Sequence, residues 1–166
     1  MTKLMISLRE FKDVDAPLLV EYLNHPQVTQ YITAAIPTPY TFEDAHWWIK
    51  HNKQSTLIKA IIYQDQFIGC ISATPGQFEY SHSAEIGYWL GHAYWQQGLA
   101  TQALTLFVEK LQQEGKFKRV FVSVVTDNNR SISVLKKNEF QLEGTLKQAS
   151  YKNGVFFDEY IYARLI

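Results

Sequence analysis

Three observations predict that this chain folds as a mixed α+β protein. Short runs rich in β-branched and aromatic residues alternate with segments whose apolar residues recur at helical spacing. Residues 56–74 hold two β-rich runs that meet at 64–66, as in an antiparallel hairpin. Residues 119–126 are so apolar (RVFVSVVT) that we expect a strand covered on both faces. We therefore expect a sheet of six to seven strands flanked by helices and parallel at its middle.

The composition limits the classes of function. The 166 residues contain 16 Lys and Arg against 16 Asp and Glu, a formal net charge of +0, so no basic field is available for a nucleic acid. We find no linker or repeat and expect a single domain over 1–166. Cys70, the only cysteine, lies in an apolar run, which predicts a buried small side chain rather than a nucleophile.

The hydropathy of the chain argues against a membrane protein. No segment approaches the ~20 apolar residues that span a bilayer, and the first residues lack the apolar core and cleavage site of a secretory signal. We expect a cytoplasmic protein.

In the first half of the chain we expect a strand over 5–11, then a helix that Asp13 or Asp15 caps and that ends before His25-Pro26. Residues 27–40 contain two prolines and predict a loop or a broken helix. Thr41, followed by acidic residues in the first turn, predicts the start of a helix that continues through Asn52. This helix carries two tryptophans, which are more typical of a core or a partner contact than of a cofactor site.

The second half predicts the remaining elements from the same signals. We expect strands over 82–90 and 119–126, helices over 99–114 and 131–138, and a final hairpin of 141–151 and 155–165 around Asn153-Gly154.

The stretch from Glu85 to Leu104 has the strongest functional signal. A strand runs into the turn Gln96–Ala100 and then into a helix. Gly98 can adopt backbone angles that are closed to other residues, and Ala100 is small, so successive N–H groups can turn toward one point at the positive end of the helix. The stretch therefore predicts an anion cradle, although one glycine in a strand-to-helix turn is also common for purely structural reasons.

Four phrases give the chain a family resemblance. They are WQQGLA at 95–100, NNRSISVLKKNEF at 128–140, LEGTLKQASYKNG at 142–154 and FDEYIYARLI at 157–166. In order and spacing they resemble the GNAT superfamily of N-acetyltransferases, and within it the branch of ribosomal-protein N-terminal alanine and serine acetyltransferases. The resemblance implies a bent mixed sheet and acetyl-CoA as the acetyl donor. It also implies direct attack by a primary amine within one ternary complex, without a metal.

The resemblance also implies the residues that bind the coenzyme. Backbone groups of Tyr88, Trp89 and Leu90 would pair with the pantetheine arm, in a slot where the strands ending at Leu90 and Val125 splay apart. The pyrophosphate would be held by Gln96, Gln97, Gly98, Leu99, Ala100 and Thr101. Asn128 would lie at the mouth of the slot, with its amide toward the pantetheine or the acceptor. An asparagine that follows a strand is also an ordinary start of a helix.

Two residues are candidates for proton transfer. Glu85 is an acidic residue in an otherwise apolar strand, and burial would raise its pKa toward the value that a general base needs. Its alternative role is a strand-edge carboxylate paired with a Lys or Arg. Ser131 resembles the helix serine that the branch places near the coenzyme sulfur, and its alternative role is to cap its helix.

The sequence departs from the family pattern at four positions. Trp95 stands where Gln or Arg is usual, so one side-chain contact would be lost. Glu139 replaces a glycine, so a tight turn must be made differently or with strain. Leu135 replaces a tyrosine acid, and Ser150 stands where the serine-acetylating members have glutamate.

The acceptor remains open at this point. The branch implies the N-terminal amino group of a protein, and a small amine such as an amino sugar or a polyamine is the alternative. A non-catalytic module that senses acyl-CoA is an alternative of another class. The five histidines lack the spacing of metal ligands, and the edge of the last hairpin makes a homodimer plausible.

Overall fold

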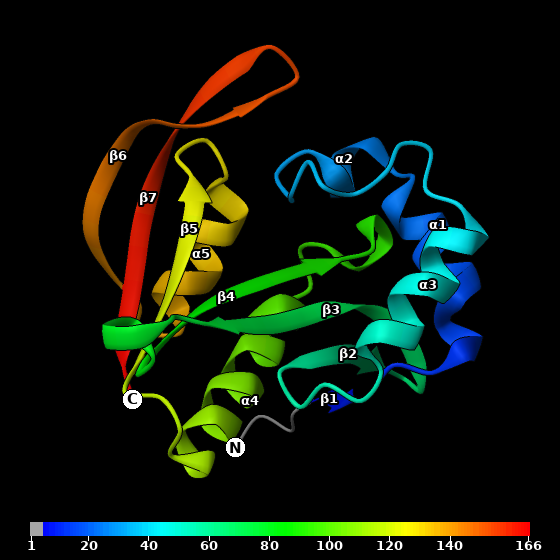
Figure 1. Ribbon diagram of the computed structural model, residues 1–166, viewed down its shortest axis with the longest axis horizontal. Helices are drawn as coiled ribbons and strands as arrows, with labels where there is room; N and C mark the ends of the chain where they lie inside the picture. The colour runs from blue at the N-terminus through cyan, green and yellow to red at the C-terminus, as the bar shows by residue number, and fades with distance from the viewer. Residues whose placement is uncertain (1–4) are drawn as a thin grey trace. The chain divides into compact units, whose positions relative to one another are not determined.

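The computed structural model describes residues 5–166, which form seven strands and five α-helices (Figure 1). The strands are β1 (Ile6–Arg9), β2 (Ile58–Tyr63), β3 (Gln66–Pro75), β4 (Ser83–Leu90), β5 (Arg119–Val125), β6 (Gln141–Lys152) and β7 (Val155–Leu165). The helices are α1 (Ala16–Leu23), α2 (Pro26–Thr29), α3 (Phe42–Asn52), α4 (Leu99–Glu114) and α5 (Asn129–Lys137). Short 3-10 turns are η1 (Asp13–Asp15), η2 (Phe78–Tyr80) and η3 (His92–Tyr94).

The strands hydrogen-bond in the order β1-β2-β3-β4-β5-β7-β6. The β4–β5 pair is parallel, and the pairs β1–β2, β2–β3, β5–β7 and β6–β7 are antiparallel. The predicted mixed α+β fold, with a sheet that is parallel at its middle, is therefore confirmed.

The chain divides into two compact units. The first comprises the chain up to Ser72 together with Tyr88–Ala103, and the second comprises Ala73–Gly87 with Leu104–Ile166. The elements β3, β4 and α4 contribute residues to both units. That residues 1–166 form one domain stays a prediction.

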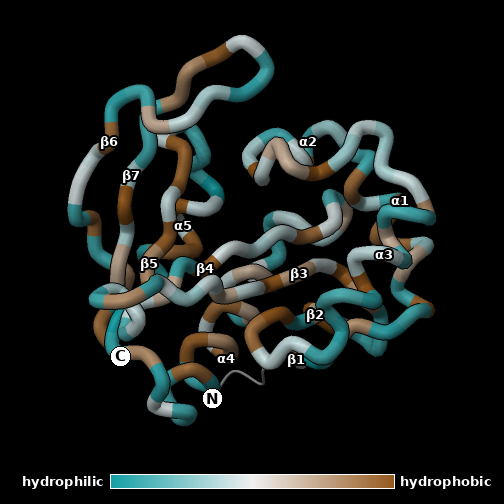
Figure 2. Tube along the Cα trace, in the orientation of Figure 1, coloured by the Kyte–Doolittle hydropathy of each residue, from teal (hydrophilic) through white to brown (hydrophobic). Residues whose placement is uncertain are grey.

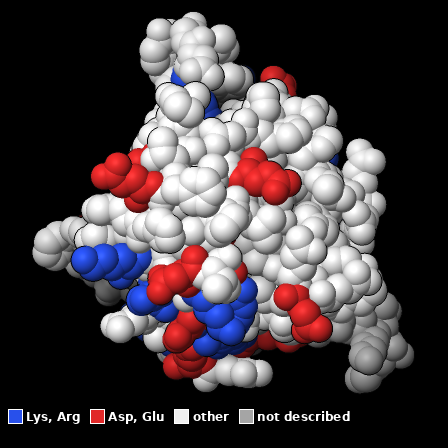
Figure 3. All heavy atoms as spheres, turned by 90° about the vertical axis from the view of Figure 1, so that its right-hand side faces the viewer, with Lys and Arg blue, Asp and Glu red and all other residues white. Residues whose placement is uncertain are grey.

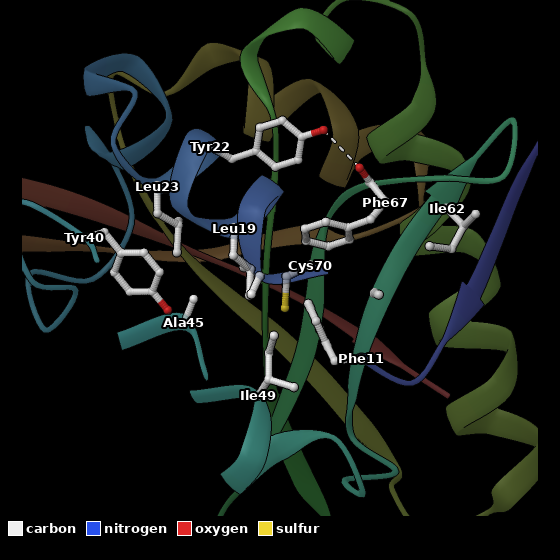
Figure 4. Close-up of a cluster of buried hydrophobic side chains, with 12 residues drawn as sticks. Phe11, Leu19, Tyr22, Leu23, Tyr40, Ala45, Ile49, Ile62, Phe67 and Cys70 are labelled. Atoms are coloured by element: carbon white, nitrogen blue, oxygen red, sulfur yellow. Dashed lines mark hydrogen bonds between the residues drawn. The ribbon is translucent and has the colours of Figure 1, made fainter. Parts of the chain in front are cut away.

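The first unit has an aromatic core (Figure 4). Phe11 packs edge-on against Phe67 with ring centroids 5.3 Å apart, and the Tyr22 hydroxyl donates to the Phe67 carbonyl at 3.0 Å. Cys70 lies in the same cluster, and burial raises the pKa of its thiol to about 12. Its predicted role as a buried small side chain is confirmed.

The predicted start of α3 is also confirmed. The Thr41 hydroxyl accepts the Asp44 N–H at 3.2 Å, and the Asp44 carboxylate accepts the Thr41 N–H at 2.8 Å, which completes a capping box. Asp15 precedes α1 but does not cap it through its side chain. Its buried carboxylate pairs with Arg9 at 2.7 Å and accepts the Lys12 N–H, because a buried charge is stable only when it is paired.

The two tryptophans of α3 have different environments. Trp48 packs edge-on against Phe11 in the core, whereas Trp47 is 60% exposed and stacks on His51. Figure 3 shows charges of both signs on the face over α1 and α3, some of them adjoining and others isolated among uncharged atoms. The surface shown there is not a field of one sign. No helix within 5–166 is long and apolar enough to cross a membrane.

The second unit is built around α4 and β5, whose hydrophobic residues are visible in Figure 2. Val120, Val122 and Val124 are buried, and the alternate residues of β5 are half-buried. The expectation of a strand covered on both faces is therefore confirmed for one face, whereas the other face of β5 is only half-covered. α4 has the predicted bounds.

Both predicted hairpins are present. Gln64 and Asp65 join β2 to β3 with φ of 49° and 62°, and Asn153 and Gly154 join β6 to β7 with φ of 52° and 78°. Two consecutive residues in the left-handed region match the right-handed twist of the flanking strands.

Candidate active site

The end of β4 in the first unit is held closely against β3. The Gly91 N–H donates to the Ile68 carbonyl at 2.8 Å. A Cβ atom at Gly69 would lie 2.2 Å from the Trp89 carbonyl oxygen, so this approach of the two backbones requires glycine. Trp89 and Leu90, two of the three residues expected to bind the pantetheine arm, therefore sit on a strand end that lies close against β3.

The turn after β4 has the geometry that an anion cradle needs. Gly98 has a φ of 74°, as its predicted role requires, and no atom lies within 4 Å of the position of a Cβ there. The Gln102 N–H donates to the Gly98 carbonyl at 3.2 Å, which starts α4. The first N–H groups of a helix have no acceptor within the helix, and the first turn of α4 has no acidic side chain to repel an anion.

Gln96 has a left-handed backbone conformation that the sequence does not predict. Its φ is 60°, although it is not a glycine. Holding a non-glycine residue there costs about 1 kcal/mol. The Gln97 side-chain amide donates to the Ala93 carbonyl at 3.0 Å and ties the middle of the turn to η3. The predicted pyrophosphate residues thus belong to one continuous turn and the first residues of α4.

Trp95 makes a contact that sequence reasoning missed. Its indole N–H donates to the Leu90 carbonyl at 3.0 Å. The expected loss of a side-chain contact at this position is therefore offset by a different one. The sequence shows that Trp95 follows the strand end by five residues and carries an N–H donor. It does not show which carbonyl group accepts the hydrogen bond.

Glu85 lies in the second unit, on β4. It is the last β4 residue in the parallel ladder, opposite Phe121, and its side chain is exposed. The expectation that burial activates this carboxylate was wrong, because side chains alternate between the two faces of a strand and Ala84 and Ile86 take the buried face. Among the salt bridges that the structure shows within residues 5–166, none joins Glu85 to a Lys or Arg.

Asn128 and Ser131 share one helix start. The Asn128 side-chain oxygen accepts the Ser131 N–H at 3.3 Å, so Asn128 caps α5. Ser131 lies inside the first turn of the helix, and its alternative role as the cap was wrong. The two candidate residues lie together at the end of β5, where the Asn128 N–H donates to the Val125 carbonyl at 2.9 Å.

The turn that ends α5 keeps a left-handed residue without glycine, which is the strained one of the two alternatives that the sequence leaves open. Glu139 has a φ of 63°. Arg164 donates to the Asn138 carbonyl at 3.0 Å and pairs with the Glu139 carboxylate at 3.4 Å. Leu135 is fully buried and supplies no proton donor.

The last hairpin carries a bulge opposite Asp158. The β6–β7 register shifts between Leu146 and Ser150, and Gln148 has a φ of 49°. The Asp158 carboxylate accepts the Gln148 N–H at 2.8 Å and the Lys147 ammonium at 3.1 Å. These bonds lower the pKa of Asp158. Asp158 thus has a structural role in shaping β6.

Tyr151 packs on Phe156 with ring centroids 4.7 Å apart, and both side chains are exposed on the last hairpin. Among residues 5–166, no three His, Cys, Asp or Glu side chains gather in a way that holds a metal ion.

A glycine turn that leads from a strand of a mixed sheet into the positive end of a helix is typical of proteins that bind a phosphate-bearing cofactor. A family model described as an acetyltransferase (GNAT) domain matches residues 6–141. The chain belongs to this family of N-acetyltransferases, as its motifs predict.

Three comparisons describe the relatives of the chain. It is 35% identical over 116 residues to the ribosomal-protein-serine acetyltransferase of Escherichia coli, a match that covers 70% of this chain and 64% of that protein. It is 25% identical to the solved structure of RimL, a ribosomal L7/L12 alpha-N-protein acetyltransferase in complex with coenzyme A. The TM-score is 0.86, with 100% of this chain and 97% of that chain covered. The microcin C7 self-immunity acetyltransferase MccE, in complex with acetyl-CoA and AMP, has 25% identity and a TM-score of 0.85. That match covers 98% of this chain and 93% of that one.

Both solved relatives were determined with their coenzyme bound. GNAT enzymes use acetyl-CoA, and both solved relatives hold coenzyme A or its acetyl thioester. The turn described above fits such a molecule, because the side of Gly98 is open and no acidic residue stands in the first turn of α4.

Proposed function

We propose that this protein transfers the acetyl group of acetyl-CoA to the N-terminal amino group of a protein, by direct attack in a ternary complex. The observation that carries the proposal is the turn at Gln96–Thr101, with Gly98 in the left-handed region at the start of α4. The names of two relatives, a ribosomal-protein-serine acetyltransferase and a ribosomal L7/L12 alpha-N-protein acetyltransferase, support the choice of acceptor. A ribosomal-protein acceptor would place the enzyme in the cytoplasm.

The turn supplies the coenzyme site in this proposal. Gln96, Gln97, Gly98, Leu99, Ala100 and Thr101 hold the pyrophosphate through their backbone N–H groups. Tyr88, Trp89 and Leu90 offer strand-end amides to the pantetheine arm. Support comes from the geometry of this segment, in which the turn follows a strand end that Gly69 allows to approach β3 closely.

Asn128 and Ser131 have supporting roles in the proposal. Asn128 already caps α5 through its side-chain oxygen, which leaves its amide NH₂ to donate to the pantetheine or the acceptor. Ser131 is a hydrogen-bond donor to the departing thiolate, a role that requires its hydroxyl rather than its backbone N–H.

Glu85 is the proposed base. An α-amino group has a pKa of about 8, so part of it is protonated at neutral pH and must lose a proton before attack. Glu85 is the only acidic residue of β4, and its exposed carboxylate is open to an amine or to a water that relays the proton. Acetyl transfer then needs no enzyme nucleophile, in agreement with the burial of Cys70.

The proposal is tested by incubating the purified protein with acetyl-CoA and a panel of acceptors, followed by mass spectrometry. The panel contains peptides that begin with Ser or Ala, the same peptides with a blocked N-terminus, and small amines such as an amino sugar and a polyamine. We expect acetylation of the free peptides only. Acetylation of small amines alone would overturn the protein acceptor. Tight coenzyme binding without any transfer would indicate a sensor.

The proposed homodimer has one supporting feature. β6 is the last strand of the sheet, and its outer edge and the side chains of Leu142 and Leu146 are exposed.

A further inference from the structure

Three rings form a contact series beside the coenzyme turn in the first unit. The imidazoles of His25 and His92 stack with centroids 4.5 Å apart and planes 12° apart. His92 in turn meets the Trp95 indole edge-on, with centroids 4.6 Å apart. The series joins His25, the residue that directly precedes α2, to the residue that directly precedes Gln96.

The series ends on a hydrogen bond to the strand that the turn follows. The Trp95 indole N–H donates to the Leu90 carbonyl at 3.0 Å, and the Trp95 backbone N–H donates to the His92 carbonyl at 3.3 Å. These two bonds close residues 90–95 into a loop. The loop lies between the two segments that the proposed function assigns to pantetheine and pyrophosphate.

The unusual backbone conformation of Gln96 gives this loop a role, because the loop ends at the residue next to Gln96. A non-glycine residue at a φ of 60° does not hold that conformation by preference. The surrounding structure must impose it, and Trp95 is the adjacent residue with a side-chain bond to the strand. A turn that is shaped before the ligand arrives spares the ligand the cost of ordering it.

We propose that Trp95 is a positioning residue for the coenzyme turn, and that His92, stacked on His25, holds the Trp95 indole against the Leu90 carbonyl. This inference rests on the proposed coenzyme site. Trp95 acts through the backbone of Gln96 and Leu90 rather than by touching the reacting atoms.

The first test is Trp95→Phe, which keeps an aromatic ring and removes the N–H donor. A part-buried hydrogen bond of ordinary strength corresponds to a change of about 5-fold. We expect the Kd and the KM for acetyl-CoA to rise about 5-fold, while the KM for the acceptor peptide changes much less. Trp47→Phe is the matched control, because Trp47 belongs to the same unit and is exposed on α3.

A second pair of variants tests the ring series. His92→Ala removes the ring that holds the indole, and His92→Phe replaces it with another ring. We expect His92→Ala to weaken acetyl-CoA binding and His92→Phe to restore most of it. The effect of Trp95→Phe combined with His92→Ala should be smaller than the sum of the single effects, because both act through one contact.

Hydrogen exchange in the absence of coenzyme separates this inference from the proposed function. Fragments that cover residues 91–98 should exchange about 5-fold faster in Trp95→Phe than in the wild-type protein or Trp47→Phe. Faster exchange in a protein that never binds acetyl-CoA would support the positioning of the turn and overturn the coenzyme site. Unchanged exchange and an unchanged Kd in a folded Trp95→Phe protein would overturn the role of Trp95.

Discussion

At the scale of single residues, the proposed proton transfer depends on Glu85. The carboxylate is exposed on β4, at the last pair of the parallel ladder with β5. Its local sequence suggests burial because its neighbours are apolar, but a strand sends successive side chains to opposite faces. A base that is exposed when no ligand is bound remains chemically competent, because an acceptor or a water can reach it.

We expect Glu85→Gln to lower kcat/KM for the peptide by about 10²-fold or more, the ordinary contribution of a general base. The KM for acetyl-CoA should change little. The measurement is the rate of thiol release between pH 6 and pH 9. Glu109→Gln, an exposed glutamate on α4, is the control. Turnover that matches the wild-type rate at every pH would exclude Glu85 as the base.

Glu139 is a residue whose backbone conformation costs free energy of folding. Its φ of 63° is the conformation for which a helix end prefers glycine. Its exposed ion pair with Arg164 contributes little, because water screens exposed pairs.

We expect Glu139→Gly to raise the free energy of unfolding by about 0.5–1 kcal/mol, because glycine adopts this φ without steric cost. Glu139→Ala is the matched control, since it removes the same ion pair but keeps a Cβ atom. The measurement is the urea midpoint of each variant. If Glu139→Gly is no more stable than Glu139→Ala, the backbone is not strained at this position.

At the scale of elements, capping decides the roles of neighbouring residues. Asn128 caps α5, which leaves Ser131 one turn inside the helix and removes capping as an explanation for it. Thr41 and Asp44 cap α3 reciprocally, at the helix start that the sequence predicts. A helix cap is predictable from the sequence when the residue that it bonds lies three positions further on. The choice between two candidate capping residues requires the hydrogen bond that the structure shows.

The β6–β7 hairpin gives a pH prediction. The Gln148 N–H and Lys147 hold the pKa of Asp158 below its ordinary value. A lowered folded pKa means that the stabilisation is complete above the unfolded pKa of about 3.9 and is lost as the pH falls through the lower folded value. We expect the bulge at 147–149 to open only in that acidic range in the wild-type protein.

Asp158→Asn should remove this dependence, because a neutral amide does not titrate. The measurement is hydrogen exchange of fragments covering 146–150 between pH 2 and pH 6, corrected for the intrinsic exchange rate. Glu159→Gln, at the next position of β7, should behave as the wild-type protein does. A bulge whose protection in Asp158→Asn still falls with the wild-type pH profile would contradict the role of Asp158.

At the scale of the whole molecule, most of the element order was predictable from the sequence. The bounds of α4, the capped start of α3 and the two-residue turn at Asn153-Gly154 follow from signals within a few residues of each other. The family was predictable as well, because four separate phrases had to agree in order and spacing. The matched family model then extends over 6–141.

Side-chain assignments within the site were less predictable. The exposure of Glu85, the structural role of Asp158 and the strain at Gln96 depend on which groups meet, and apolar spacing does not report that. The sequence predicts that Trp95 loses the side-chain contact of the usual Gln or Arg. In the structure its indole N–H makes a different contact, with the Leu90 carbonyl.

The amino-acid sequence by itself determined the class of fold, the position of the glycine turn and the family, because helical period, strand alternation and turn residues act over short distances along the chain. Only the tertiary structure decided how the turn is supported. His25 and His92 are far apart in the sequence, and their stack beside Trp95 forms only when the start of α2 and η3 pack in one unit. Contacts of that kind depend on the packing of whole elements, which no local pattern encodes.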